Sequence, residues 1–240
     1  MTGLGTAVNV AAIIIGATVG LLIKGGLSER FQDTVTKAVG LSVMFVGMSG
    51  TLPGLLTVVD GVLVSRDIML MVGCLIVGSL LGEWIDIELR MEQLGIWCRT
   101  RIPNQNQKNS TFVEAFVSSS LLFCVGAMAI VGAMEDGLNH NYSILFAKAV
   151  MDGTLAIIFT ASLGFGVYLS AIPVAVYQGA ITILSGFIKP YLNDTLVSQI
   201  SMIGSILIFA IGINLVFGKR IKVGNMLPAM FLPVFVQIFM

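Results

Sequence analysis

Apolar runs of about twenty residues recur along this chain, and they constrain its fold more than any other feature. A helix needs about 20 apolar residues to cross about 30 Å of hydrocarbon, where no water can satisfy an exposed backbone. The expected spans lie near residues 4–23, 38–59, 68–84, 112–134, 144–163, 167–187, 196–217 and 226–240. The sequence therefore predicts an all-α polytopic membrane helix bundle.

The number of crossings is seven or eight, because two of these runs need interpretation. Residues 144–187 are too long for one crossing, and Gly164 and Gly166 mark the place where the chain reverses. The last run holds Pro228 and Pro233, so it is a tilted span, a half-span or a re-entrant segment.

Charge is scarce and balanced in this chain. Only 11% of the residues are charged, well below the roughly 25% of soluble domains. Thirteen basic residues match thirteen acidic ones, so net charge gives no argument for a nucleic-acid partner. The expected partners are the lipid bilayer and an unknown small molecule or ion, and a homo-oligomer is left open.

The positions of lysine and arginine predict the orientation. Of the thirteen basic residues, Arg66 and Lys189 fall in external segments and Lys148 falls inside a span, which leaves ten in cytoplasmic segments. The N-terminus is then outside. Residues 85–111, the longest polar segment, are expected to form a cytoplasmic amphipathic helix followed by a linker.

A weak internal similarity relates the two halves of the chain. Four identities share an offset of 148 residues, namely Gly5 with Gly153, Thr6 with Thr154, Gly16 with Gly164 and Val19 with Val167. A duplicated four-helix unit of this kind would be a parallel repeat about an axis along the membrane normal. Close packing of small residues explains the glycines equally well.

Two formal charges in the run 144–163 are the sharpest candidate site. Lys148 and Asp152 are four residues apart, so one face of a helix carries both. A charge near the bilayer centre costs roughly 2.5 to 3.5 kcal/mol, and such groups usually line a path for substrate, ions or protons. Asp152 should lie about 12 Å deep, while Lys148, about 6 Å deep, is able to snorkel outward. A purely structural ion pair is the alternative.

Six further side chains are candidates for substrate or ion binding. They are Asn9, Glu114, Ser118, Tyr177, Gln178 and Asn214. Each uncharged one is as able to join two helices as to contact a ligand. Glu114 lies in the first turn of its run, where a carboxylate at headgroup level is often only solvated.

Motifs for catalysis and metal binding are weak. Residues 47–50 spell GxSG and are similar to the serine motif of rhomboid intramembrane proteases, but Ser49 lacks a histidine at membrane depth. The only histidine, His140, falls in an external loop with Glu135 and Asp136 that is expected to be a solvated polar turn. The three cysteines lack CxxC spacing. We expect no enzyme activity, no cofactor and no metal site.

Several segments carry a resemblance to a known family. They include residues 151–153, 170–174 and 177–179, together with stretches at 5–20, 123–134 and 222–228. Over nearly its whole length the chain resembles the YqgA/YdfK type, an uncharacterised family of bacterial multi-pass membrane proteins. The resemblance implies an inner-membrane protein with a transport activity, and it assigns no substrate or catalytic residue.

These features together predict a secondary transporter or facilitator of a small polar or ionic solute, with the charge pair in the translocation path. Asp152 would bind the coupling proton or cation, and Lys148 would be its counter-charge. One alternative is a non-transporting membrane scaffold or accessory subunit in which the pair is structural. The other is an intramembrane enzyme.

Overall fold

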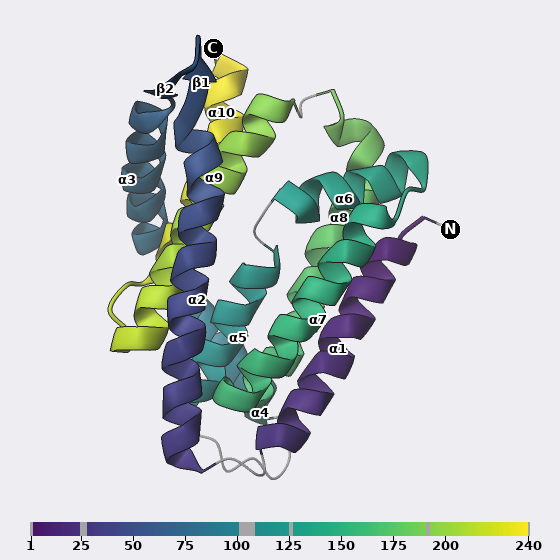
Figure 1. The fold of residues 1–240 in the computed structure, drawn as a ribbon, viewed down its shortest axis with the longest axis vertical. Coiled ribbons are helices and arrows are strands. Elements are labelled where there is room, and N and C mark those ends of the chain that lie inside the picture. The colour runs from purple at the N-terminus through teal and green to yellow at the C-terminus, as the bar shows by residue number, and fades with distance from the viewer. Residues whose placement is uncertain (1, 25–27, 101–108, 125–126, 191–192, 240) are drawn as a thin grey trace. The chain divides into compact units, whose positions relative to one another are not determined.

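The computed structural model describes residues 2–24, 28–100, 109–124, 127–190 and 193–239, and nearly all of this part is helical (Figure 1). Six of its helices are long and apolar enough to cross a membrane. A bent pair of shorter helices brings the number to seven. The predicted all-α polytopic bundle is confirmed.

Contacts divide the chain into two compact units, each assembled from segments far apart in sequence. Unit 1 comprises Met1–Val39, Met91–Cys124 and Met128–Tyr191, and unit 2 comprises Gly40–Arg90, Val125–Ala127 and Leu192–Met240.

Unit 1 contains most of the predicted site residues. Its elements are α1 (Leu4–Lys24), the first turns of α2 (Glu29–Leu55), most of α4 (Ile87–Thr100), α5 (Asn109–Cys124), α6 (Ala127–Asn139), α7 (Ser143–Leu163), the 3-10 helix η1 (Phe165–Ser170) and α8 (Ala171–Ile188). As predicted, the chain breaks between α7 and η1, where Gly164 has a φ of 91° that favours glycine.

Helices α1 and α7 of unit 1 run side by side in the same direction (Figure 1). Gly16 lies against the backbone carbonyl of Gly153, and Gly20 lies against that of Ile157. A side chain at either glycine would collide with these carbonyl groups. The glycines therefore allow the close approach that small-xxx-small spacing predicts.

Unit 2 contains the rest of α2, the strands β1 (Leu56–Val59) and β2 (Val62–Ser65), and the helices α3 (Ile68–Ile85), α9 (Asp194–Phe217), η2 (Val223–Phe231) and α10 (Leu232–Phe239). Its helices also meet at glycines. Gly47 lies against the α9 backbone at Phe209, and Gly82 lies against the carbonyl of Asn225 in η2. Packing therefore accounts for these glycines too.

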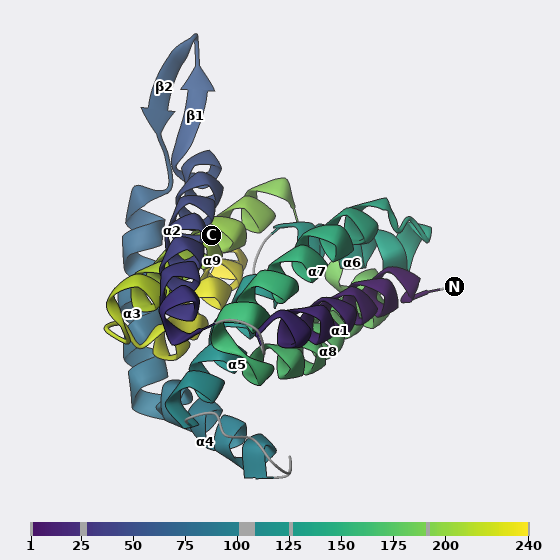
Figure 2. The same cartoon turned by 60° about the horizontal axis from the view of Figure 1, so that its bottom comes forward.

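The expected span 38–59 is wrong at its C-terminal end. Helix α2 continues through Pro53 but ends at Leu55, and residues 56–65 form an antiparallel hairpin that projects from the end of α2 (Figure 2). Asp60 and Gly61 make the turn with φ values of 50° and 79°. Asp-Gly between β-branched residues favours this turn, because both of its central residues need a positive φ.

The structure also differs from the expected span 112–134, because two helices, α5 and α6, occupy the place of one. Residues Thr111–Cys124 and Met128–Asn139 are bent by 58°. Helix α6 turns its own polar residues inward, since Asp136 contacts the start of α1 and Gly137 contacts α8 at Thr182. The expected linker falls mostly on residues 101–108, which lie outside the described residues.

The last expected span corresponds to η2 and α10. The apolar stretch Val223–Gln237 is shorter than the other candidates. However, a 3-10 helix rises about 2.0 Å per residue, so nine residues of η2 and eight of α10 extend about 30 Å together. This length matches the hydrocarbon thickness, which keeps an eighth crossing feasible.

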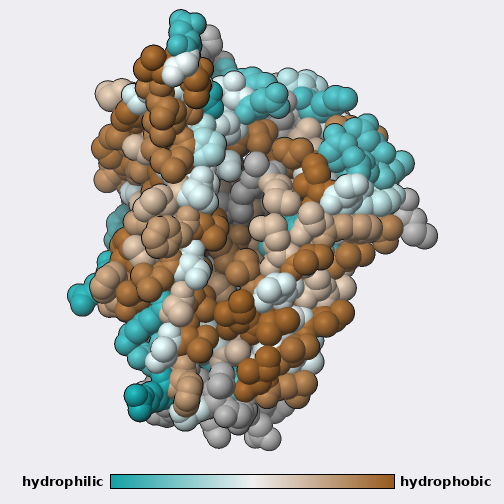
Figure 3. Space-filling view, in the orientation of Figure 1, coloured by the Kyte–Doolittle hydropathy of each residue, from teal (hydrophilic) through white to brown (hydrophobic). Residues whose placement is uncertain are grey.

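The outward faces of the helices are apolar, as lipid contact requires. In unit 1, Leu22, Ile183 and Phe187 are among the most exposed side chains, and in unit 2 Met69 and Leu80 are. Apolar side chains cover much of the visible sides of the helices (Figure 3). The buried polar groups described next are therefore exceptions to the lipid-facing pattern.

Candidate functional site

The predicted charge pair lies inside unit 1. The Lys148 ammonium donates to Asp152 Oδ1 at 2.9 Å and lies 2.8 Å from Oδ2. The two side chains are only 8% and 5% exposed. The expectation that Lys148 snorkels outward is wrong, because its ammonium turns along α7 to the carboxylate one helical turn away.

Asn9 brings α1 to this pair, and Gln178 brings α8. Asn9 Nδ2 donates to Asp152 Oδ2 at 3.0 Å and to Gln178 Oε1 at 3.3 Å. Both amide side chains are fully buried. Four of the eight predicted site residues thus form one network, although Asn9 is 143 residues from Asp152 in sequence. We call Asn9, Lys148, Asp152 and Gln178 the buried cluster.

Two atoms of the buried cluster have no hydrogen-bond partner among the described residues. They are the acceptor Asn9 Oδ1 and the donor Gln178 Nε2. An unsatisfied buried polar group costs about 1–3 kcal/mol, and such groups are rare in folded proteins. The cluster therefore has hydrogen-bonding capacity that the described protein groups do not use.

Polar side chains continue from the cluster toward the N-terminal end of α1. Thr6 and Thr182 bring their hydroxyl oxygens to 3.5 Å from each other. Beyond them the buried Asp136 accepts hydrogen bonds from the backbone N–H groups of Gly3 and Gly5, at 2.8 and 2.9 Å. The solvated turn expected at Asp136 is wrong, because its carboxylate satisfies the free donors and positive dipole at the start of α1.

Thr6, Thr182 and Asp136 were not among the predicted binding residues. Their spacing from predicted residues could have indicated the two threonines. Thr6 and Asn9 are three residues apart on α1, and Gln178 and Thr182 are four residues apart on α8. Such spacing places each pair on one helix face. The position of Asp136 depends on a contact across more than 130 residues, which spacing does not reveal.

Apolar side chains close the other side of the cluster. Ile13, Ala156, Phe159 and Val174 are all fully buried. Together with the glycine contacts between α1 and α7, they pack tightly beyond the cluster, and the buried Thr160 and Ser162 lie further along α7. Apolar packing thus covers the cluster on this side.

The remaining predicted residues lie elsewhere. Tyr177 is half-buried next to Gln178 on α8, and α5 carries the half-buried Glu114 and the buried Ser118. Asn214 belongs to unit 2, where its amide accepts from the backbone of Arg220 and Ile221 and donates to the Ile221 carbonyl. Its bonds hold the turn after α9, and they do not join it to the buried cluster.

The same turn region of unit 2 is held by charged contacts. Glu83 accepts hydrogen bonds from Lys222 and Asn225. The hydrogen bond to Glu83 raises the pKa of Lys222 above its usual value. These groups are at the ends of their helices, so they stabilise the junction of α3 and η2.

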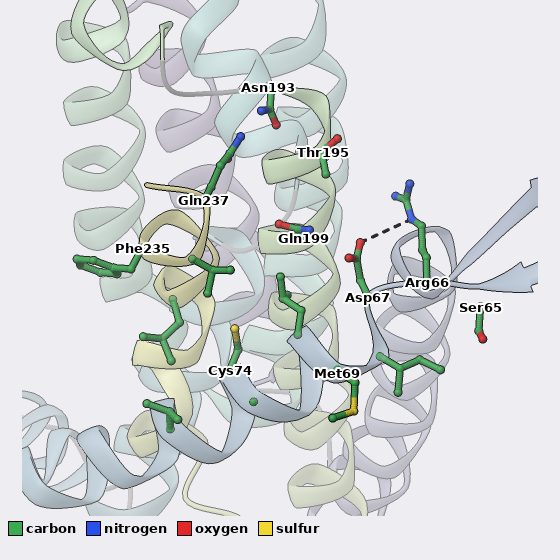
Figure 4. Close-up of a pocket in the computed structure, with 16 residues that line it drawn as sticks. Ser65, Arg66, Asp67, Met69, Cys74, Asn193, Thr195, Gln199, Phe235 and Gln237 are labelled. Carbon is green, nitrogen blue, oxygen red and sulfur yellow. Dashed lines mark ion pairs between the residues drawn. The ribbon is translucent and has the colours of Figure 1, made fainter. Parts of the chain in front are cut away.

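A groove of about 1150 Å³ opens in unit 2 among α3, α9 and α10. Figure 4 shows Asn193, Gln199 and Gln237 at one end and Cys74 deeper along α3. Arg66 donates to the Gly54 carbonyl and to Ser198 Oγ and lies 3.8 Å from Asp67. None of the predicted site residues lines this groove, whose walls are mostly apolar.

Two observations in the described part of the chain concern metal binding and serine catalysis. No group of three or more histidine, cysteine, aspartate or glutamate side chains is placed to hold a metal ion there. The Ser49 hydroxyl donates to the Val46 carbonyl of its own helix at 3.0 Å.

Comparisons with known proteins find two uncharacterised relatives and one family. The family described as "Protein of unknown function (DUF554)" matches residues 4–238. The "Uncharacterized membrane protein YdfK" of Bacillus subtilis (strain 168) is 29% identical over 229 residues, covering 95% of this chain and 93% of YdfK. The "Uncharacterized protein YqgA" of Escherichia coli (strain K12) is 28% identical over 231 residues, covering 95% and 94%. No solved structure matches.

Proposed function

Because this chain belongs to the DUF554 family, whose matched relatives are uncharacterised and include a membrane protein, we propose a function from the site itself. The protein is a secondary transporter or facilitator of a small polar or ionic solute. The buried cluster is its translocation site. It resides in the bacterial inner membrane with its N-terminus outside, and it acts without enzymatic turnover.

One observation carries the proposal: a desolvated ion pair is bonded to two buried amides that keep an acceptor and a donor unused. Stability gives little reason for such a pair. Replacing a buried ion pair by apolar side chains of similar size is often neutral or stabilising by about 1–4 kcal/mol. Ionisable groups at membrane depth more often serve substrates, ions or protons.

The polar groups around the cluster support a route to it. Thr6 and Thr182 lie between the cluster and Asp136 on the side where α1 begins. The other side is closed by apolar packing. A transporter that alternates between two openings closes one side of its central site at a time.

Flux measurements in liposomes containing the purified protein test the proposal. A thermal-shift screen of metabolites and ions first identifies solutes that stabilise the protein by mass action. We expect net uptake of at least one such solute, and Asp152→Asn should abolish it while leaving the protein folded. The matched control is Asp33→Asn, which alters the carboxylate of an exposed i,i+4 ion pair with Lys37. No Asp152-dependent flux across the whole panel would refute transport.

A further inference from the structure

The buried cluster carries no net charge in the structure. Lys148 contributes one positive charge and Asp152 one negative charge. The thiol of Cys124 on α5 interacts electrostatically with both, and Tyr177 on α8 interacts with Cys124. A thiol and a phenol at their ordinary pKa values are uncharged near neutral pH. Helix α1 presents the neutral amide of Asn9.

Other titratable side chains on the neighbouring elements lie away from the pair. Asp136 of α6 bonds the start of α1, and Lys24 donates to the Ser162 carbonyl at the opposite end of α1. Glu114 precedes Cys124 on α5 by ten residues, or about 15 Å along the helix. Tyr168 of η1 stacks on Phe165. Net charge in the cluster is therefore set by Lys148 and Asp152.

A net charge in this desolvated place would be costly, so an occupant must leave the cluster neutral. A metal cation at Asp152 would compete with donors already placed at the carboxylate. The Lys148 ammonium bonds both carboxylate oxygens, and Asn9 Nδ2 also bonds Oδ2. A hard cation also needs six or more oxygen ligands, as calcium does, or near-octahedral geometry, as magnesium does. A proton needs only one lone pair of Asp152.

The cluster keeps hydrogen-bond donors without acceptors although it contains a cation. Lys148 has three N–H bonds, and the acceptors recorded for it among the described residues are the two oxygens of Asp152. Gln178 Nε2 carries two N–H bonds without an acceptor, and Asn9 Oδ1 is the one acceptor atom of the cluster that receives no hydrogen bond. Unused donors in a cluster that holds a cation suit an anion, which supplies acceptors only.

We infer that the buried cluster takes up one small monovalent anion together with one proton, an inference that rests on the proposed transport function. The proton adds to a carboxylate oxygen of Asp152 and converts it to the neutral acid. Lys148 keeps its charge and exchanges the carboxylate for the anion, with Gln178 Nε2 as a neutral donor. The net charge is zero before and after, since one positive and one negative charge enter together.

Electroneutrality gives the two charged residues different roles, and two variants separate them. In Asp152→Asn the loaded site, Lys148 with its anion, is still neutral, but the empty site holds an unpaired cation. This variant should exchange anion for anion while losing net uptake. In Lys148→Gln no cation remains for the anion, so both exchange and net uptake should be lost.

The experiment uses liposomes loaded with a pH-sensitive dye and three labelled probes: L-lactate, nitrate and L-alanine. Lactate and alanine match in size, but alanine is a zwitterion. We expect wild type to take up lactate or nitrate with one proton per anion, at a rate that a potassium potential set with valinomycin does not change. Net uptake should fall about a hundredfold or more in Asp152→Asn, because an unpaired charge is buried. Exchange should stay within about tenfold of wild type.

Other outcomes overturn the inference in distinguishable ways. Proton-independent uptake of alanine that requires both residues would show a zwitterion site, and lactate or nitrate exchange that survives in Lys148→Gln would show that Lys148 does not hold the anion. In both cases the transport function would stand, and the proposed anion site at Lys148 would be refuted. Anion uptake whose rate follows the potassium potential would also overturn the inference. This measurement needs only the wild-type protein. Absence of any Asp152-dependent flux would remove the proposed function as well.

Discussion

Replacing Asp152 by leucine should lower the free energy of unfolding by about 3–5 kcal/mol, the usual cost of leaving one partner of a buried ion pair without the other. The structure explains why the cost is not relieved. The Lys148 side chain is only 8% exposed, so water does not reach the ammonium once its contacts to Asp152, at 2.8 and 2.9 Å, are lost. Lys148→Met should cost a similar amount, because it leaves the carboxylate unpaired.

The double variant Lys148→Met with Asp152→Leu should recover most of this loss. Both charges are then absent, and Asn9 keeps its hydrogen bond to Gln178 Oε1. We expect a stability within about 1 kcal/mol of wild type and a coupling energy of about 3 kcal/mol or more. Unfolding in mixed micelles of mild detergent and dodecyl sulfate, followed by circular dichroism, measures all four proteins.

Asp33 and Lys37 provide the matched control for this cycle. They form an i,i+4 ion pair of 2.7 Å, but their side chains are 63% and 54% exposed. Exposed pairs of this kind contribute less than about 1 kcal/mol, so the same cycle there should show little coupling. Single-variant losses below about 1 kcal/mol at Lys148 and Asp152, or additive losses in the double variant, would refute the buried-pair argument.

Three further outcomes are expected. Gly16→Ala should destabilise the protein by about 1–3 kcal/mol because its methyl group meets the α7 backbone, whereas Gly179→Ala, with open space around it, should stay within about 1 kcal/mol of wild type in the same titration. Cysteines at positions 106 and 139 should be labelled from the cytoplasmic and external sides respectively, and the reverse pattern would contradict the orientation that the basic residues predict. Ser49→Ala should keep its flux and serine-directed phosphonates should not label the protein; stoichiometric labelling at Ser49 would revive the protease alternative.

The sequence predicted local features of this fold well. Apolar runs of helical length gave the membrane helices, and Gly164 gave the break after α7. The four-residue spacing of Lys148 and Asp152 correctly placed both charges on one helix face, where they pair. These features depend on residues within one or a few helical turns, which a single sequence shows directly.

The assembly of the buried cluster was less accessible. Asn9 and Gln178 were candidates, but nothing in their spacing joins them, because their contact spans 169 residues. This contact forms only because the glycine-containing face of α1 packs against α7. Other helices of the chain carry similar glycine-containing faces, so the sequence does not show which two faces meet. The hairpin at Asp60 and Gly61 is different. Its Asp-Gly turn is visible in the sequence, but the apolar residues of β1 continue the run of the expected span 38–59.

The most direct test of the central claim is solute flux by the double variant Lys148→Met with Asp152→Leu in liposomes, measured beside wild type and the Asp33→Asn control. The account predicts a folded protein without net uptake, because the apolar pair restores packing but can bind neither a proton nor a charged solute. A folded double variant that transports at the wild-type rate would show that the pair is structural, and it would contradict the assignment of the buried cluster as the translocation site.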